Sequence, residues 1–156
     1  MYDLEEARLI DEIKKRSPRR VLLQLPEGLK PRAARLAEKL QAATGAEIVV
    51  SGDQCYGACD LALHQVKELR ADLLIHVGHA EIPGEYPHDD IIYVEARSDE
   101  KIEGPLVEAL KLLKDEKSVG LAASVQHLHL LKQAKESLEQ AGKTVLTGKA
   151  SGRLKH

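Results

Sequence analysis

The chain alternates short, almost wholly apolar runs with longer segments in which apolar residues recur at helical spacing. The apolar runs predict strands over 21–23, 46–50, 72–77 and 90–95. The helical spacing predicts helices over 3–16, 32–43, 60–70 and 104–115. Strands without polar alternation are typical of a parallel sheet covered on both faces. We therefore expect an α/β fold, with a four-stranded parallel sheet and flanking helices.

A second strand–helix–strand unit follows. Its strand, helix and strand are predicted over 118–124, 126–141 and 143–147. Three of its residues repeat the spacing of the first unit, with Val119, Gly142 and Thr147 in the places of Val21, Gly45 and Ser51. We expect a first α/β domain over 1–116 and, over 117–156, the first βαβ half of a second similar domain.

The helix of that second unit carries an apolar stripe, formed by Leu128, Leu131, Ala134 and Leu138. Two strands offer little surface to cover such a stripe. We expect the unit to bury it poorly alone, and therefore to pack on the first domain or on another copy of the chain.

Composition excludes several classes of protein. The formal net charge is -2 and aromatic residues make up 3%, so neither a basic nucleic-acid surface nor a base-stacking platform is expected. No apolar run is long enough to span a membrane, and the acidic, amphipathic beginning of the chain differs from a signal peptide. We expect a cytoplasmic protein whose thiols stay reduced.

Four loops follow the strands of the predicted sheet. They read QLPEG (24–28), SGDQCYGACD (51–60), HVGHAEIPGEYP (76–87) and EARSD (95–99). The carboxyl ends of parallel strands meet at one edge of a sheet, and this fold binds ligands there. Candidate binding residues are therefore expected in these loops.

Both cysteines of the chain lie in the second loop. Cys59 stands at the start of the predicted helix CDLALHQVKEL, where the helix dipole would lower the pKa of its thiol, and Gly57 leaves space beside it. A small buried cysteine in a tight turn is the structural alternative. Zinc bound by Cys55 and Cys59 with His76 and His79 is a further possibility on spacing.

Five stretches carry a resemblance to a known family. They are VLLQLPEGL (21–29), GDQCYGACDLA (52–62), ADLLIHVGHAEIP (71–83), VQHLH (125–129) and GKASGR (148–153). Together and in this order, they resemble the diphthamide-synthesis enzymes, in particular the archaeal 2-(3-amino-3-carboxypropyl)histidine synthases.

The resemblance implies three similar α/β domains, each giving one cysteine to a central 4Fe-4S cluster. It implies a radical transferase that moves the 3-amino-3-carboxypropyl group of S-adenosylmethionine to a histidine of translation elongation factor 2. A homodimer and an electron donor are also implied, without direct contact to nucleic acid or membrane. The motif cysteine falls on Cys59, whereas no role carries over to Cys55.

The fold indicates where the S-adenosylmethionine that the resemblance implies would bind, because α/β sheets bind ligands at their strand-end loops. Its polar groups are expected near residues of the strand-end loops of both units, namely Pro26, Glu27, Gly28, Tyr56, His79, Gln126 and His127.

The chain departs from the family pattern in one respect. Only one of the three cluster cysteines has a counterpart here, so we expect an N-terminal fragment of a longer enzyme that is inactive alone. Two alternatives stay open: a small zinc- or redox-binding module that uses Cys55 and Cys59, and a non-catalytic partner subunit.

Overall fold

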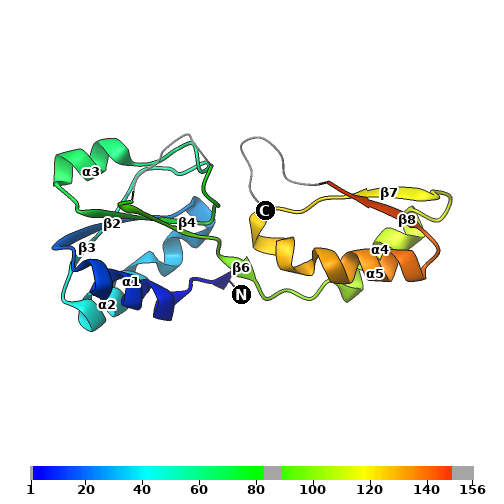
Figure 1. Ribbon diagram of the computed structural model, residues 1–156, viewed down its shortest axis with the longest axis horizontal. Helices are drawn as coiled ribbons and strands as arrows, with labels where there is room; N and C mark the ends of the chain where they lie inside the picture. The colour runs from blue at the N-terminus through cyan, green and yellow to red at the C-terminus, as the bar shows by residue number, and fades with distance from the viewer. Residues whose placement is uncertain (1, 83–88, 149–156) are drawn as a thin grey trace.

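The computed structural model describes residues 2–82 and 89–148. Figure 1 shows two bodies joined by a single extended segment. We call residues 2–98 the first unit and residues 103–148 the second unit. The first unit contains a four-stranded sheet and the second a two-stranded sheet.

The sheet of the first unit is parallel throughout. Its strands are β2 (Arg20–Gln24), β3 (Glu47–Val50), β4 (Leu73–Val77) and β5 (Ile91–Val94), in the order β3-β2-β4-β5. β2 and β4 lie at the centre, and every residue of β4 is buried. This explains why these strands are apolar without alternation. The predicted four-stranded parallel sheet is confirmed.

Helices cover both faces of this sheet. Helices α1 (Glu6–Arg16) and α2 (Ala33–Thr44) lie on one face, and α3 (Leu63–Leu69) lies on the other (Figure 1). Leu23 and Ile75 belong to the core cluster under α1 and α2, whereas Leu22 and Leu74 belong to the cluster under α3. Successive residues of a strand thus fill two cores.

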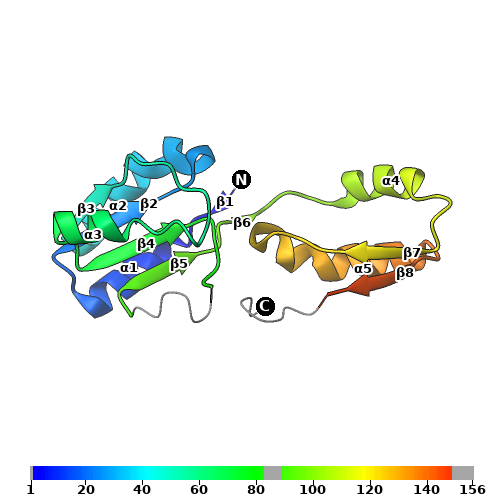
Figure 2. The same cartoon turned by 90° about the horizontal axis from the view of Figure 1, so that it is seen from above.

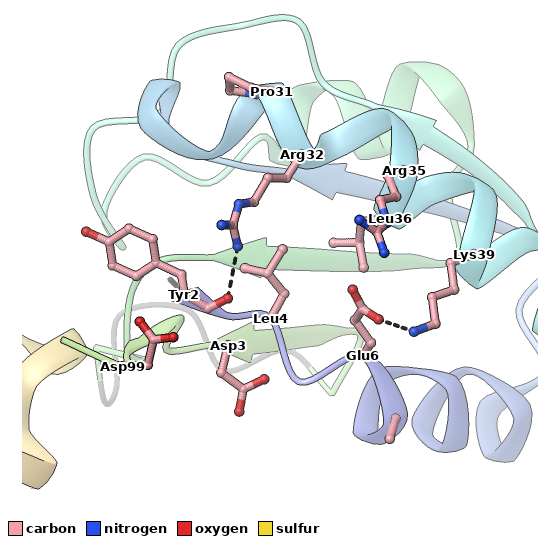
Figure 3. Close-up of a pocket in the computed structure, with 11 residues that line it drawn as sticks. Tyr2, Asp3, Leu4, Glu6, Pro31, Arg32, Arg35, Leu36, Lys39 and Asp99 are labelled. Atoms are coloured by element: carbon pink, nitrogen blue, oxygen red, sulfur yellow. Dashed lines mark hydrogen bonds and ion pairs between the residues drawn. The ribbon is translucent and has the colours of Figure 1, made fainter.

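A cavity of about 780 Å³ marks where the N-terminal segment docks (Figure 3). Strand β1 (Tyr2–Asp3) pairs antiparallel with β6 (Arg97–Ser98) beside it. Arg32 donates a hydrogen bond to the Tyr2 carbonyl oxygen at 3.1 Å, and Lys39 forms an ion pair with Glu6. Two basic side chains of the cavity therefore hold the segment against α2.

The second unit repeats the strand–helix–strand order with fewer layers. It contains α4 (Glu103–Leu112), β7 (Ser118–Leu121), the 3-10 helix η2 (Val125–Leu130), α5 (Leu131–Gln140) and β8 (Thr144–Thr147). β7 and β8 are parallel, and both helices lie on the same face of the pair (Figure 1).

The apolar stripe of α5 is better buried than expected. Ala134 and Leu138 are 7% and 2% exposed, and Val145 of β8 is also buried. Leu128 and Leu131 are half-buried. The expectation of poor burial was wrong for Ala134 and Leu138, because β8 and α4 pack against α5. The division into domains near residue 116 stays a prediction.

Two helix boundaries also differ from the prediction. The helix expected from residue 60 begins at Leu63, and the one expected over 126–141 consists of η2 followed by α5. The N–H of Ala62 and the carbonyl oxygen of Asp60 both bond to the side chain of Gln24. Those bonds tie residues 60–62 to the end of β2 and keep them out of α3. None of the helices described is long and apolar enough to cross a membrane.

Candidate functional site

The carboxyl ends of the two sheets face each other. Figure 2 shows the strands of each unit pointing toward the other unit. A cleft of about 740 Å³ lies between these ends, and its lining includes Ala58, Gly78, His79, Ser124 and Gln126. Since this cleft collects strand-end loops of both units, it is the candidate binding site. Residues 83–87 of the third predicted loop lie outside the described residues.

Cys59 is exposed in a turn beside this cleft. The turn is closed by the Asp60 N–H, which donates to the Gly57 carbonyl oxygen at 3.0 Å, and the Asp60 carboxylate accepts from the Tyr56 N–H at 3.0 Å. α3 begins only at Leu63. The expectation that Cys59 starts a helix was therefore wrong, and the dipole argument for its thiolate no longer holds.

Gly57 lies directly beside the sulfur of Cys59. A Cβ added at Gly57 would lie 3.6 Å from the Cys59 Sγ, which is an ordinary van der Waals contact. Packing of the turn alone therefore does not demand glycine here. A side chain at position 57 would, however, occupy space next to that sulfur.

Cys55, in contrast, is buried and belongs to a different group. Its exposed fraction is 5%. Potential ligand atoms of Cys55, His76 and His79 all lie within 4.8 Å of one another. The Nε2 atom of His76 is 2.9 Å from the Nδ1 atom of His79. Of the zinc ligands considered from spacing, the structure thus brings three together and leaves Cys59 out of that group.

Gln24, which sequence reasoning missed, holds His76 and residues 60–62 in place through hydrogen bonds of its side chain. Its Nε2 donates to the Asp60 carbonyl oxygen at 2.7 Å, and its Oε1 accepts from the Ala62 N–H at 3.1 Å. The same Oε1 lies 2.8 Å from the Nδ1 of His76. An oxygen acceptor requires that this Nδ1 carries the proton. The signal in the sequence was a polar residue at the end of an otherwise apolar strand.

Burial keeps the group neutral. Desolvation and, less strongly, the nearby His79 lower the pKa of His76 to about 4, although the Asp60 carboxylate opposes them. Burial also lowers the pKa of His79. Burial raises the pKa of the Cys55 thiol, against a backbone hydrogen bond from Gly57 that lowers it. At neutral pH these groups therefore form an uncharged, hydrogen-bonded network.

The predicted residues of the first loop lie close to the other loops but outside the cleft lining. Pro26 packs on Gly78, where φ is +92° and an added Cβ would lie 3.0 Å from the Pro26 Cγ. Glu27 forms an ion pair with Lys30, whose ammonium also donates to the Gly52 carbonyl oxygen at 2.9 Å. Gly28 is exposed. These contacts hold the ends of β2, β3 and β4 together.

The remaining predicted residues divide between the cleft and its surroundings. His79 and Gln126 line the cleft, and the Gln126 side-chain amide donates to the Gly78 carbonyl oxygen, which joins the two units. Tyr56 is 78% exposed, and the Nδ1 of His127 lies 3.1 Å from the Ser124 hydroxyl oxygen. Neither Tyr56 nor His127 contributes to the cleft lining in the described part of the chain.

The sequence matches a family model and several curated proteins. The family model, described as "Putative diphthamide synthesis protein", matches residues 25–156. The 2-(3-amino-3-carboxypropyl)histidine synthase of Pyrococcus horikoshii is 34% identical, over 99% of this chain and 45% of the relative. That of Methanocaldococcus jannaschii is 33% identical over 88% of the chain. Subunit 1 of the Homo sapiens synthase is 31% identical over 88% of the chain and 32% of the relative.

Solved structures match over the same length. The crystal structure of Dph2 from Pyrococcus horikoshii has a TM-score of 0.84 and 34% identity, and the match covers 99% of this chain and 45% of that one. A second crystal structure of the same protein, with a 4Fe-4S cluster, has a TM-score of 0.82. The chain spans about half the length of the archaeal relatives it matches.

Proposed function

This chain belongs to the diphthamide synthesis protein family, and on that premise we propose that it works as part of a 2-(3-amino-3-carboxypropyl)histidine synthase. The reaction proposed breaks the bond between the sulfonium sulfur of S-adenosylmethionine and its side-chain carbon. The released 3-amino-3-carboxypropyl group forms a carbon–carbon bond to the imidazole of a histidine in elongation factor 2. The rest of S-adenosylmethionine leaves as 5′-methylthioadenosine, and the substituted imidazole carbon loses its hydrogen as a proton and an electron. A homodimer and an external electron donor belong to this proposal through the family resemblance alone, and a cytoplasmic setting belongs to it through the composition of the sequence.

Cys59 is the residue of this chain that would hold the cluster. The observation that carries the proposal is its position, exposed and adjacent to Ala58, which lines the cleft at the carboxyl ends of the strands. Iron–sulfur clusters are held by cysteine thiolates, and an exposed thiol can reach one, whereas Cys55 is buried. One thiolate binds one iron of a 4Fe-4S cluster, so the ligands of the other irons would come from outside this chain. When bound, the cluster supplies the electron for reductive cleavage of the carbon–sulfur bond.

The cleft has the size and lining for S-adenosylmethionine. Its volume of about 740 Å³ lies within the range of roughly 300–1,000 Å³ that is common for small-molecule sites. Apolar side chains make up most of its lining, with His79 and Gln126 among the polar ones. His79 offers a neutral imidazole, and the Gln126 amide, fixed by the Gly78 carbonyl, keeps its oxygen for the ligand. The chain would thus orient the substrate beside Cys59.

The test compares the two cysteines in the protein that carries this chain. After anaerobic reconstitution, Cys59→Ala should lose most of the iron per chain and end transfer from carboxyl-labelled S-adenosylmethionine to elongation factor 2. Cys55→Ala should keep the iron and serves as the matched control from the same loop. Loss of iron in Cys55→Ala together with its retention in Cys59→Ala would reverse the assignment.

A further inference from the structure

We propose that Cys55, His76 and His79 form a binding site for a single divalent transition-metal ion, with zinc as the best match, separate from any cluster on Cys59. The three residues come from the loop after β3, the end of β4 and the loop after β4. They are the group in the described part of the chain whose ligand atoms lie close enough to share a metal ion.

The spacing of the ligand atoms is near that of a metal site. Zinc–nitrogen and zinc–sulfur bonds of about 2.0 and 2.3 Å place tetrahedral ligands roughly 3.3–3.8 Å apart. The largest separation in the group is within 4.8 Å, and His76 and His79 approach to 2.9 Å. A metal ion would therefore draw the sulfur and the two nitrogens to similar distances from one another, with the imidazoles slightly further apart, which small side-chain rotations allow.

Gln24 prepares His76 as a ligand. Because the Nδ1–H of His76 donates to the Gln24 Oε1 at 2.8 Å, the lone pair of Nε2 points away from Gln24 and toward His79. Metal-binding histidines commonly have their second nitrogen held in this way, which fixes the tautomer and the ring plane. Without a metal, the two imidazoles are joined by a hydrogen bond in which the His79 Nδ1–H donates to the His76 Nε2. A bound metal ion would take the place of the proton between these two nitrogens.

The charge balance suits a dication. Asp60 acts electrostatically on all three groups, and its carboxylate with a Cys55 thiolate would neutralise two positive charges. Burial disfavours that thiolate without a metal, whereas a bound zinc ion deprotonates its thiol ligand. Three protein ligands leave a fourth position free. His79 lines the cleft, so water or a substrate group could reach the ion from that side.

Cobalt(II) is the probe for this site. The chain is first stripped of metal with a chelator and kept reduced, and cobalt is then titrated in. We expect binding of one ion per chain, with visible bands of tetrahedral cobalt and a thiolate-to-cobalt charge-transfer band, and release of cobalt by added zinc. Cys55→Ser should remove the charge-transfer band, and His79→Asn should weaken binding by about tenfold or more.

Cys59→Ser is the matched control, because it removes the other thiol of the same loop. It should keep the cobalt spectrum while it loses iron–sulfur loading, so the metal site and the proposed function can fail independently. The proposal is overturned if the wild-type chain shows no charge-transfer band. It is equally overturned if the band disappears in Cys59→Ser and persists in Cys55→Ser. Circular dichroism of each variant confirms folding, and His79→Asn decides the matter if Cys55→Ser does not fold.

Discussion

The segment from β2 to β3 and the segment from β7 to β8 have the same local structure in different surroundings. Each contains a strand, a six-residue 3-10 helix, an α-helix and a parallel strand. In both, the α-helix is followed by a glycine with a left-handed backbone, Gly45 with φ 77° and Gly142 with φ 80°. The backbone of one unit is therefore largely reproduced in the other.

Their burial is what differs. β2 lies between two neighbouring strands and between helices on both faces, whereas β7 and β8 have only each other and helices on one face. Leu146 of β8 is 65% exposed. Both multi-residue core clusters of the described chain belong to the first unit. The comparison teaches that local signals form the elements, while the number of layers decides how much stability they gain.

The largest expected effect comes from one leucine of each helix. Leu40 of α2 and Leu138 of α5 occupy corresponding positions and are 0% and 2% exposed. Leu40→Ala should lower the free energy of unfolding by about 4 kcal/mol, because a rigid core leaves a cavity. Leu138→Ala should cost about 2 kcal/mol, since a thinner layer can collapse around the gap. Denaturant titration measures the first, and hydrogen exchange over 118–147 measures the second.

Leu146→Ala provides the control for this pair. Its side chain is mostly exposed, so its removal should change stability by less than about 0.5 kcal/mol. Equal losses in Leu40→Ala and Leu138→Ala would show that the two units are equally well packed, and would break the comparison.

Acid should weaken the first unit through His76. The pKa of this histidine is lowered to about 4 in the folded chain, against about 6.5 when unfolded. A histidine whose pKa is lower in the folded state than in the unfolded state stabilises the fold fully above its unfolded-state pKa. This stabilisation is lost as the pH falls toward its folded-state pKa. Between pH 7 and pH 4 the metal-free chain should lose on the order of 3 kcal/mol from this group.

The measurement is denaturant unfolding across this pH window with a chelator present. His76→Asn should flatten the dependence, because it removes the group that must stay neutral. A wild-type stability that stays level from pH 7 to pH 4 would show that His76 is readily solvated.

The sequence predicted the sheet well because its signals are local. Apolar runs such as 72–77 need only their own composition to indicate a buried strand. The start of α3 was missed because Gln24, far away in the chain, binds residues 60 and 62. Cys55 looked like a mid-loop bystander for the same reason. Spacing named Cys55, His76 and His79 among four possible zinc ligands, but the burial of Cys55 beside the two histidines, without Cys59, depends on contacts between loops.

The smallest expected effect uses the two glycines that end α2 and α5. No atom lies within 4 Å of a Cβ built on Gly45 or on Gly142, so alanine meets no steric obstacle at either position. The cost is therefore one of backbone conformation, about 1 kcal/mol for an L-residue at such positive φ. Because φ is nearly the same at both positions, hydrogen exchange should show that Gly45→Ala and Gly142→Ala lower the local stability of their helices by nearly equal amounts.

The global unfolding transition should nevertheless respond differently to the two glycine variants. Gly45→Ala should shift it, because α2 is part of the main core, whereas Gly142→Ala should leave it almost unchanged if the thinner unit opens by itself. A global shift of equal size in both variants would show that the two units unfold as one cooperative body. The smaller number of packed layers in the second unit would then affect its local packing, but the two units would still have one common free energy of unfolding.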